Sequence, residues 1–249
     1  MNMFFVRGNP ILAATELPDR HIGKMSVETV QMCVSALRRH GCPVEELPLN
    51  RYGEPHAGGY ANHPMTRWVG ECRNNFEWAL NHGLSLCAEW KLRWPDREHH
   101  ASVNQLLTID DRGLCEFIPT LDKLETMPWR HHADKIDTLF AQNRYTKIPL
   151  CFGDYDWQHG LSSEKIEDIH TYGRRTVAAY QLYMRHKLKG WEAKGKPPVW
   201  TNREEPLWWT TDDYIYDLIN CVRSLYDDDT SDKTHKQSCA SLPWLGAYE

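Results

Sequence analysis

The chain has 249 residues, of which 41% are hydrophobic and 11% aromatic, and its formal net charge at pH 7 is -5. This length predicts one large domain or two small ones, and the composition supplies a hydrophobic core, which excludes wholesale disorder. The net negative charge argues against a protein that coats nucleic acid through bulk electrostatics, although it leaves room for a local basic groove.

Segment composition and cysteine spacing indicate the cellular compartment. No apolar run approaches the ~18 residues of a transmembrane helix, and the N-terminus has no basic region followed by a long apolar stretch, as a signal peptide would. Eight cysteines are scattered without a Cys-x-x-Cys pair, which is typical of reduced thiols and argues against structural zinc. We therefore expect a soluble, cytoplasmic protein with no membrane partner and no cofactor.

Helices are predicted for most of the first hundred residues. Asn9 and Pro10 open a short helix that reaches Leu17, because a capping side chain followed by Pro favours a helix start. Further helices are expected at residues 24–40, 64–83, 84–94 and 97–108. Gly41 and Gly83 mark the ends of the first two of these, since Gly is favoured just beyond a helix.

The remaining segments are more varied. A loop rich in Pro and Gly spans residues 41–62, and residues 115–118 are expected to form a brief strand. A long helix is predicted at about 163–188, and a capped start at Thr210 opens a last helix to about 226. A polar, acidic stretch follows and is expected to be mobile.

These segments predict a mainly α fold, one compact unit with a helical C-terminal extension. We expect a helical region over residues 1–150, a second helical region packed on it over 151–226, and a mobile acidic tail over 227–249. The pattern does not indicate an oligomeric state.

The most informative pattern lies in residues 19–31. At about 100° per residue, His21, Lys24, Glu28 and Gln31 fall within an arc of roughly 80° on one helix face. A separate apolar stripe is formed by Val27, Val30, Val34 and Leu37. One interpretation is a solvated face with an ordinary i, i+4 ion pair between Lys24 and Glu28. The other is a catalytic face, because a His, a Lys and a Glu together suit acid–base or Schiff-base chemistry.

A second stretch combines glycines, aromatics and polar side chains just before a helix. Such a segment is a candidate contact for an anion or a base, or else a loop with a capping Asn or His. Its candidate residues are Tyr60, Asn62, His63, Arg67 and Trp68. Further on, Asn75 lies between aromatic residues, where it either pairs with a base edge or caps a buried backbone group.

Two His pairs, His99-His100 and His131-His132, do not predict a metal site. Neighbouring helical residues point about 100° apart, so they cannot chelate one ion as His at i and i+4 can. We therefore expect no metal.

At these two stretches the sequence resembles the pyrimidine-dimer DNA glycosylases of the endonuclease V type. In that family an early helix carries Asp-x-His and, seven residues after the His, a Glu essential to catalysis, a spacing kept here by Asp19, His21 and Glu28. Longer bacterial members carry a Gly-Tyr-x-Asn-His-Pro segment, matched here by residues 59–64. The chain is also similar to phage proteins related to this family, which share Lys24 and residues like Asn75-Phe76-x-Trp78.

The resemblance implies a catalytic site on the early helix, but this chain departs from the family pattern at two points. The glycosylases use the α-amine exposed by Met removal as their nucleophile, whereas Asn2 is bulky and predicts that Met1 is retained. The family's Arg-rich face after the Glu is replaced here by Gln31 and apolar residues. Lys24 is then a candidate nucleophile or phosphate contact, Glu28 the acid–base group or stabiliser of the sugar cation, and His21 an orienting group.

The predicted function is that of a nucleobase-directed DNA enzyme, glycosylase- and AP-lyase-like, acting on damaged or modified pyrimidines in DNA repair. The predicted substrate-binding residues are Asp19, Arg20, Gln31, Tyr60, Asn62, His63, Arg67, Trp68 and Asn75. Two alternatives remain: a phage transferase that modifies DNA bases, and a non-catalytic phage protein that binds a nucleotide. A phage origin would place the protein in the host cytoplasm, with DNA or a nucleotide as its partner.

Overall fold

A computed structural model describes residues 2–121, 136–137, 145–146, 148–149, 151 and 169–211. The helices of the first half are α1 (Pro10–Thr15), α2 (Asp19–Arg39), α3 (Pro64–Val69), α4 (Arg73–Arg93) and α5 (Ser102–Asp111), with 3-10 turns η1 (Val44–Glu46) and η2 (Leu114–Phe117). Two short strands, β1 (Ile136–Asp137) and β2 (Tyr145–Thr146), pair antiparallel, with Ile136 opposite Thr146. The later helices are α6 (Ile169–Glu192) and α7 (Leu207–Thr210). The prediction of a mainly helical protein is confirmed.

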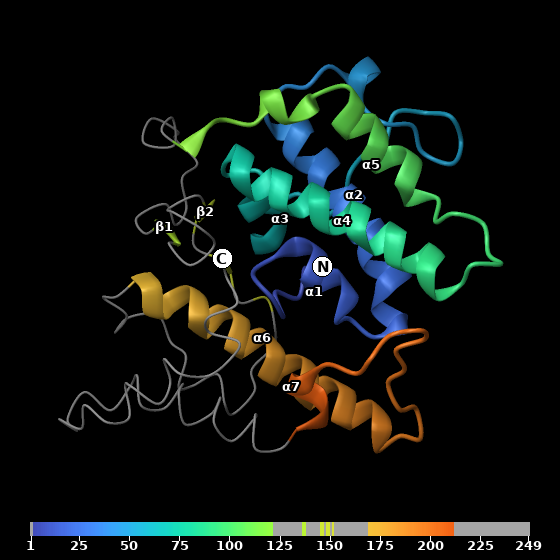
Figure 1. The fold of residues 1–249 in the computed structure, drawn as a ribbon. Coiled ribbons are helices and arrows are strands. Elements are labelled where there is room, and N and C mark those ends of the chain that lie inside the picture. The colour runs from blue at the N-terminus through green and yellow to red at the C-terminus, as the bar shows by residue number, and fades with distance from the viewer. Residues whose placement is uncertain are drawn as a thin grey trace.

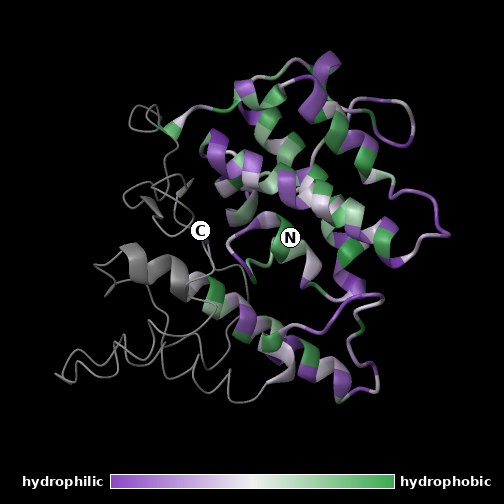
Figure 2. Ribbon diagram, in the orientation of Figure 1, coloured by the Kyte–Doolittle hydropathy of each residue, from purple (hydrophilic) through white to green (hydrophobic). Residues whose placement is uncertain are grey.

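The long helices α2 and α4 pack against each other, with α1 and α5 against α4. Figure 1 shows α6 and α7 on one side of this group, with the N-terminal segment between the two layers. Hydrophobic and hydrophilic stretches alternate along α2, α4 and α5 in Figure 2, as in helices that bury one face. No helix in the described part of the chain is both long and apolar enough to cross a membrane.

The N-terminal segment is the centre of the core. Residues 3–6 are at most 3% exposed, and the Phe5 ring stacks on Trp78 of α4 at 4.2 Å between centroids. Phe5 also contacts Tyr180 of α6 at 5.6 Å, and Gln181 donates a hydrogen bond to the Val6 carbonyl at 2.8 Å. The two layers are therefore joined through this segment, which positions Asn2.

The short helix α1 begins as predicted, because the Asn9 side chain caps it by accepting from the backbone N–H groups of Ile11 and Leu12. It ends at Thr15 rather than Leu17. The indole of Trp78 donates to the Gly8 carbonyl at 2.6 Å. Helix α1 packs on α4 and connects the N-terminal segment to α2.

Helix α2 starts at Asp19, five residues earlier than predicted, and the prediction of a start at 24 is wrong. Asp19 follows Pro18 and lies in the first turn, where a carboxylate is favourable to the helix dipole. Gly23 lies within the helix, and its lack of a side chain leaves room for the Trp90 ring, which is 3.0 Å from the position a Cβ would take. At the other end, Gly41 has a φ of +75°, as the predicted stop requires.

The break between the next helices falls at residues 70–72, not at Gly83, and this prediction is also wrong. Gly83 lies inside α4, where a Cβ would stand 2.7 Å from Thr29 Cγ2 and 2.9 Å from Leu106 Cδ1. Its lack of a side chain therefore serves the close approach of α2 and α5 to α4 rather than a helix end.

Other predictions need smaller corrections. Helix α5 covers 102–111 instead of 97–108, and the strand predicted at 115–118 is the 3-10 turn η2, which follows Gly113 with a φ of +61°. Val27, predicted in the apolar stripe of α2, is 43% exposed, whereas Val30 is buried. The first residues of the helix predicted at 163–188, most of the helix predicted to 226 and the tail lie outside the described residues. The division at residue 150 stays a prediction.

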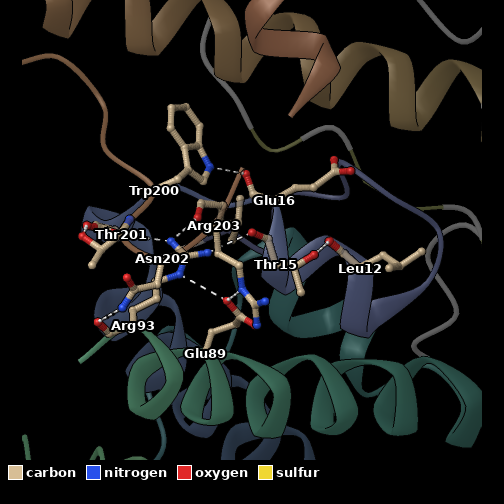
Figure 3. A network of polar contacts seen from close by, with 11 residues as sticks. Leu12, Thr15, Glu16, Glu89, Arg93, Trp200, Thr201, Asn202 and Arg203 are labelled. Carbon is tan, nitrogen blue, oxygen red and sulfur yellow. Dashed lines mark hydrogen bonds and ion pairs between the residues drawn. The ribbon is translucent and has the colours of Figure 1, made fainter. Parts of the chain in front are cut away.

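A buried polar network joins residues 193–206 to the first half of the chain (Figure 3). Arg93, 1% exposed, donates to the carbonyls of Thr15 and Leu17 and pairs with Asp19 at 3.0 Å. Glu89 accepts from Arg93 at 3.2 Å and from Arg203 Nε at 2.9 Å. Each buried charge in this network therefore has an opposite partner.

Candidate functional site

Four polar residues of α2 form the predicted face. His21 is buried, Glu28 and Gln31 are half-buried, and Lys24 is exposed. Lys24 Nζ lies 3.4 Å from Glu28 Oε1, so the predicted ion pair is confirmed. The Glu28 side chain is only 13% exposed, in contrast to 67% for Lys24. The carboxylate is therefore set into the molecule beneath an exposed ammonium, unlike a solvated surface pair.

The second oxygen of Glu28 faces the start of the chain. The backbone nitrogen of Asn2 donates to Glu28 Oε2 at 3.0 Å. The Asn2 side chain donates to the Cys151 carbonyl at 2.6 Å and accepts from the Met3 N–H at 2.8 Å. These bonds, together with the buried segment that follows, hold the Asn2 nitrogen against the carboxylate.

Lys187 of α6 lies on the same side of α2 and was not among the residues predicted from sequence. Its Nζ is 3.3 Å from Nε2 of His21, and it lies over the rings of Phe4 at 4.8 Å, Trp191 at 5.4 Å and Tyr183 at 5.8 Å. The pKa of Lys187 is lowered to about 8, mainly by burial and also by the Lys24 charge, while the Glu28 carboxylate acts in the opposite direction.

His21 is a neutral imidazole in this site. Burial lowers its pKa well below the ordinary value, and the charges of Lys187, Lys24 and Arg20 act in the same direction. A protonated Lys187 amine can only donate, so in that state Nε2 of the neutral ring accepts and Nδ1 carries the ring proton. Nδ1 is buried and has no partner among the described residues.

The glycine-containing loop is attached to α2 at Gln31 and Ser35, in the turns that follow Glu28. Ser35 Oγ accepts from the Gly59 N–H at 2.8 Å, and a Cβ at Gly58, whose φ is +77°, would overlap Ser35. A Cβ at Gly59 would lie 3.3 Å from Gln31. Tyr60, with a φ of +48°, is 71% exposed. The loop therefore presents an exposed aromatic ring close to the polar face of α2.

His63 and its neighbours complete this side of the site. His63 Nδ1 accepts from the Met65 N–H at 3.2 Å and caps α3. Burial lowers the pKa of His63, and the negative charge of Glu28 acts in the opposite direction. Arg67 donates to the Asn62 side chain at 3.4 Å on the exposed side of this loop.

Three predicted binding residues, Trp68, Asn75 and Asp19, have side chains engaged away from this site. Trp68 and Asn75 are at most 1% exposed; the Asn75 side chain donates to the Trp68 carbonyl at 2.8 Å and also to Thr146 Oγ1. A base cannot reach them, so their assignment to substrate binding is corrected to a role in the core. Asp19 has both oxygens engaged, by Arg93 and Thr201. Arg20 is exposed, with its guanidinium over the Trp191 ring at 5.1 Å.

The sequence contains a signal for Lys187 that could have been used. Tyr183, Lys187 and Trp191 are spaced i, i+4, i+8, so one face of a helix presents an amine between two aromatic rings. What the pattern cannot indicate is the partner of that face, which is His21, 166 positions earlier in the chain.

The described residues contain no group of three or more His, Cys, Asp or Glu side chains that could hold a metal ion. Of the two His pairs, His99 and His100 belong to the described residues, whereas His131 and His132 lie outside them.

Comparison with known families agrees with the resemblance seen in the motifs. Residues 1–102 match the family model described as pyrimidine dimer DNA glycosylase, so the resemblance predicted from the sequence is confirmed for this part. The match includes all of α2 and the loop before α3, and it ends before α6. No curated protein sequence matches the chain, and no solved structure does.

Proposed function

We propose that the protein is a DNA glycosylase that acts on damaged or modified pyrimidines, with Glu28 as its catalytic carboxylate. The observation that carries this proposal is the hydrogen bond from the Asn2 nitrogen to Glu28 Oε2. In the family that residues 1–102 resemble, a nitrogen at the start of the chain and a Glu on the first long helix are the two reacting groups. Here the Asn2 nitrogen is a peptide amide bonded to Met1, so it is not itself the nucleophile, but its bond to Glu28 brings the start of the chain next to the carboxylate.

The surroundings of Glu28 suit cleavage of a glycosidic bond. Breaking the bond between C1′ and the base leaves positive charge on the sugar, which a nearby carboxylate stabilises, and a carboxylic acid can protonate the departing base. Glu28 is largely enclosed and has Lys24 at 3.4 Å. Its negative charge therefore acts in a partly desolvated place, where electrostatic stabilisation of the transition state is strongest.

Positive and aromatic groups around the carboxylate support a DNA substrate despite the acidic chain. Lys24, Lys187 and Arg20 lie on the His21 side of α2, and Arg67 lies on the loop side. A base that reacts at C1′ must leave the helix stack, and an exposed aromatic ring can receive it or its neighbour. Tyr60 has that position on the loop beside Gln31.

The test is cleavage of the glycosidic bond in duplex oligonucleotides that carry a cyclobutane pyrimidine dimer or a hydroxymethylated pyrimidine, with strand incision at an abasic site as a separate assay of lyase activity. The proposal predicts base release, or incision after it, on at least one pyrimidine substrate and none on undamaged DNA. No reaction on any of them would reject the proposal. Salt-dependent binding to duplex DNA without reaction would favour base modification, and binding of free nucleotides alone would favour a nucleotide-binding protein.

A further inference from the structure

We propose that Lys187 is the nucleophilic amine of this site, which attacks the sugar C1′ and forms the Schiff base with it. This inference rests on the glycosylase proposal above. It places the nucleophile on α6, outside the residues that match the glycosylase family, while the carboxylate stays on α2. The two helices would then each supply one of the reacting groups.

The position of Lys187 is fixed by packing on both sides. Leu188 and Met184, its neighbours on α6, are fully buried, and Gln181 of the same helix binds the Val6 carbonyl. Its Nζ is enclosed by the rings of Phe4, Tyr183 and Trp191 and by His21. The amine is therefore held near the polar face of α2 with little freedom to leave it, as a nucleophile requires.

Lys187 and Lys24 differ in their partners. Lys24 pairs with Glu28 at 3.4 Å and its side chain is 67% exposed, whereas Lys187 makes no ion pair with a carboxylate among the described residues. Instead, Lys187 meets the neutral Nε2 of His21. When the amine is uncharged, one N–H is held by Nε2 and the lone pair stays available for bond formation.

The protonation state supports the same assignment. An amine must lose its proton before it can attack, and an ordinary lysine is almost entirely protonated at neutral pH. Burial among aromatic rings lowers the pKa of Lys187 to about 8, so about a tenth of the molecules carry the free amine at pH 7. Desolvation and a neighbouring cation both lower the pKa of a lysine, and enzymes use them to make its amine nucleophilic.

The proposed reaction balances without an external oxidant or reductant. The lone pair of Lys187 Nζ forms a bond to C1′, the bond from C1′ to the pyrimidine nitrogen breaks, and its electron pair leaves with the base. The base takes a proton, supplied by water. Nζ then loses a proton as the ring oxygen departs from C1′ and is protonated, which leaves an iminium ion. Water adds to that carbon and releases the abasic sugar and the free amine.

The experiment is reductive trapping with sodium cyanoborohydride on the full chain, with duplex oligonucleotides that carry a cyclobutane dimer or an abasic site. Hydride addition converts the iminium into a stable secondary amine. Proteolysis and mass spectrometry then locate the attached residue in the unmodified protein, so the result does not depend on whether a variant folds. We expect the adduct on the peptide that contains Lys187.

Variants give an independent result. Lys187→Arg keeps the positive charge and Lys187→Met keeps the aliphatic stem, and we expect both to lose the adduct while their thermal unfolding stays cooperative. The control variant Lys194→Met should retain it, since Lys194 is an exposed residue just beyond α6. A purely structural Lys187 would let the Arg variant form the adduct.

The outcomes separate the two proposals. An adduct on Lys24 or on the N-terminal residue, or one that survives Lys187→Arg, would overturn the assignment of Lys187 and leave the glycosylase proposal intact. Base release with no adduct would do the same. Neither base release nor an adduct on any substrate would overturn both proposals.

Discussion

The backbone nitrogen of Asn2 lies 3.0 Å from Glu28 Oε2 and donates a hydrogen bond to it. The contact joins the first residues of the chain to the third turn of α2, and it depends on the buried segment 3–6 that packs between α4 and α6. The site is therefore assembled by the core itself, and changes that disturb the packing of the layers are expected to disturb Glu28 as well.

Tyr60 provides a test of how the site would hold DNA. Tyr60→Ala removes a ring that is 71% exposed, and we expect it to weaken binding of a pyrimidine substrate by about 1–3 kcal/mol, the contribution of one stacked base. The control is Tyr52→Ala, which removes a ring that is 70% exposed at an earlier position of the same loop. Fluorescence anisotropy with a labelled duplex measures both. Equal effects of the two substitutions would show that Tyr60 does not contact the base.

The pKa of Lys187 predicts how the trapping rate depends on pH. Its folded pKa is lowered to about 8, so the reactive free amine increases as pH rises and the protonated form dominates below 8. On an abasic-site substrate the initial trapping rate should rise about tenfold between pH 7 and pH 9 and then level off. A rate that keeps rising through pH 10 would indicate an amine with the ordinary pKa of lysine and contradict the assignment.

Gly83 tests the packing of α4 against α2 and α5. Gly83→Ala places a methyl group 2.7 Å from Thr29 Cγ2 and 2.9 Å from Leu106 Cδ1, so we expect a loss of about 1–3 kcal/mol in the free energy of unfolding. Gly190→Ala is the matched control, because Gly190 is also helical but a Cβ there meets nothing within 4 Å. This control should be stabilised by about 0.5–1 kcal/mol. Urea denaturation of both variants decides whether the close approach exists.

Arg93 tests the network that attaches residues 193–206. Arg93→Met leaves Asp19 and Glu89 without their shared partner in a buried place, and breaking such a pair costs about 3–5 kcal/mol. Arg38→Met, at an exposed position of α2, should stay within about 0.5 kcal/mol of the parent protein. Thermal unfolding of both variants measures the difference. Similar midpoints for the two would contradict the network as described.

The sequence predictions were accurate where the structure depends on local interactions, and they failed where it depends on contacts between residues far apart in the chain. Local signals identified α1 from Asn9 and the end of α2 from Gly41, and helical spacing predicted the pair Lys24 and Glu28. Gly83 misled the prediction, because a glycine that ends a helix and one that admits a neighbouring helix look alike in sequence. Lys187 was missed because its position at the site depends on the packing of α6 against the N-terminal segment, a contact between residues far apart in the chain.

The most direct test of the account is the rate of glycosidic-bond cleavage by Glu28→Gln on a dimer-containing duplex under single-turnover conditions. The substitution keeps the shape of the side chain and removes its charge and its acid–base function, so we predict a rate about 10²–10⁴-fold below that of the parent protein. Glu77→Gln, at an exposed position of α4, should leave the rate unchanged. A Glu28→Gln variant that folds and cleaves the glycosidic bond at the parental rate would contradict the central claim.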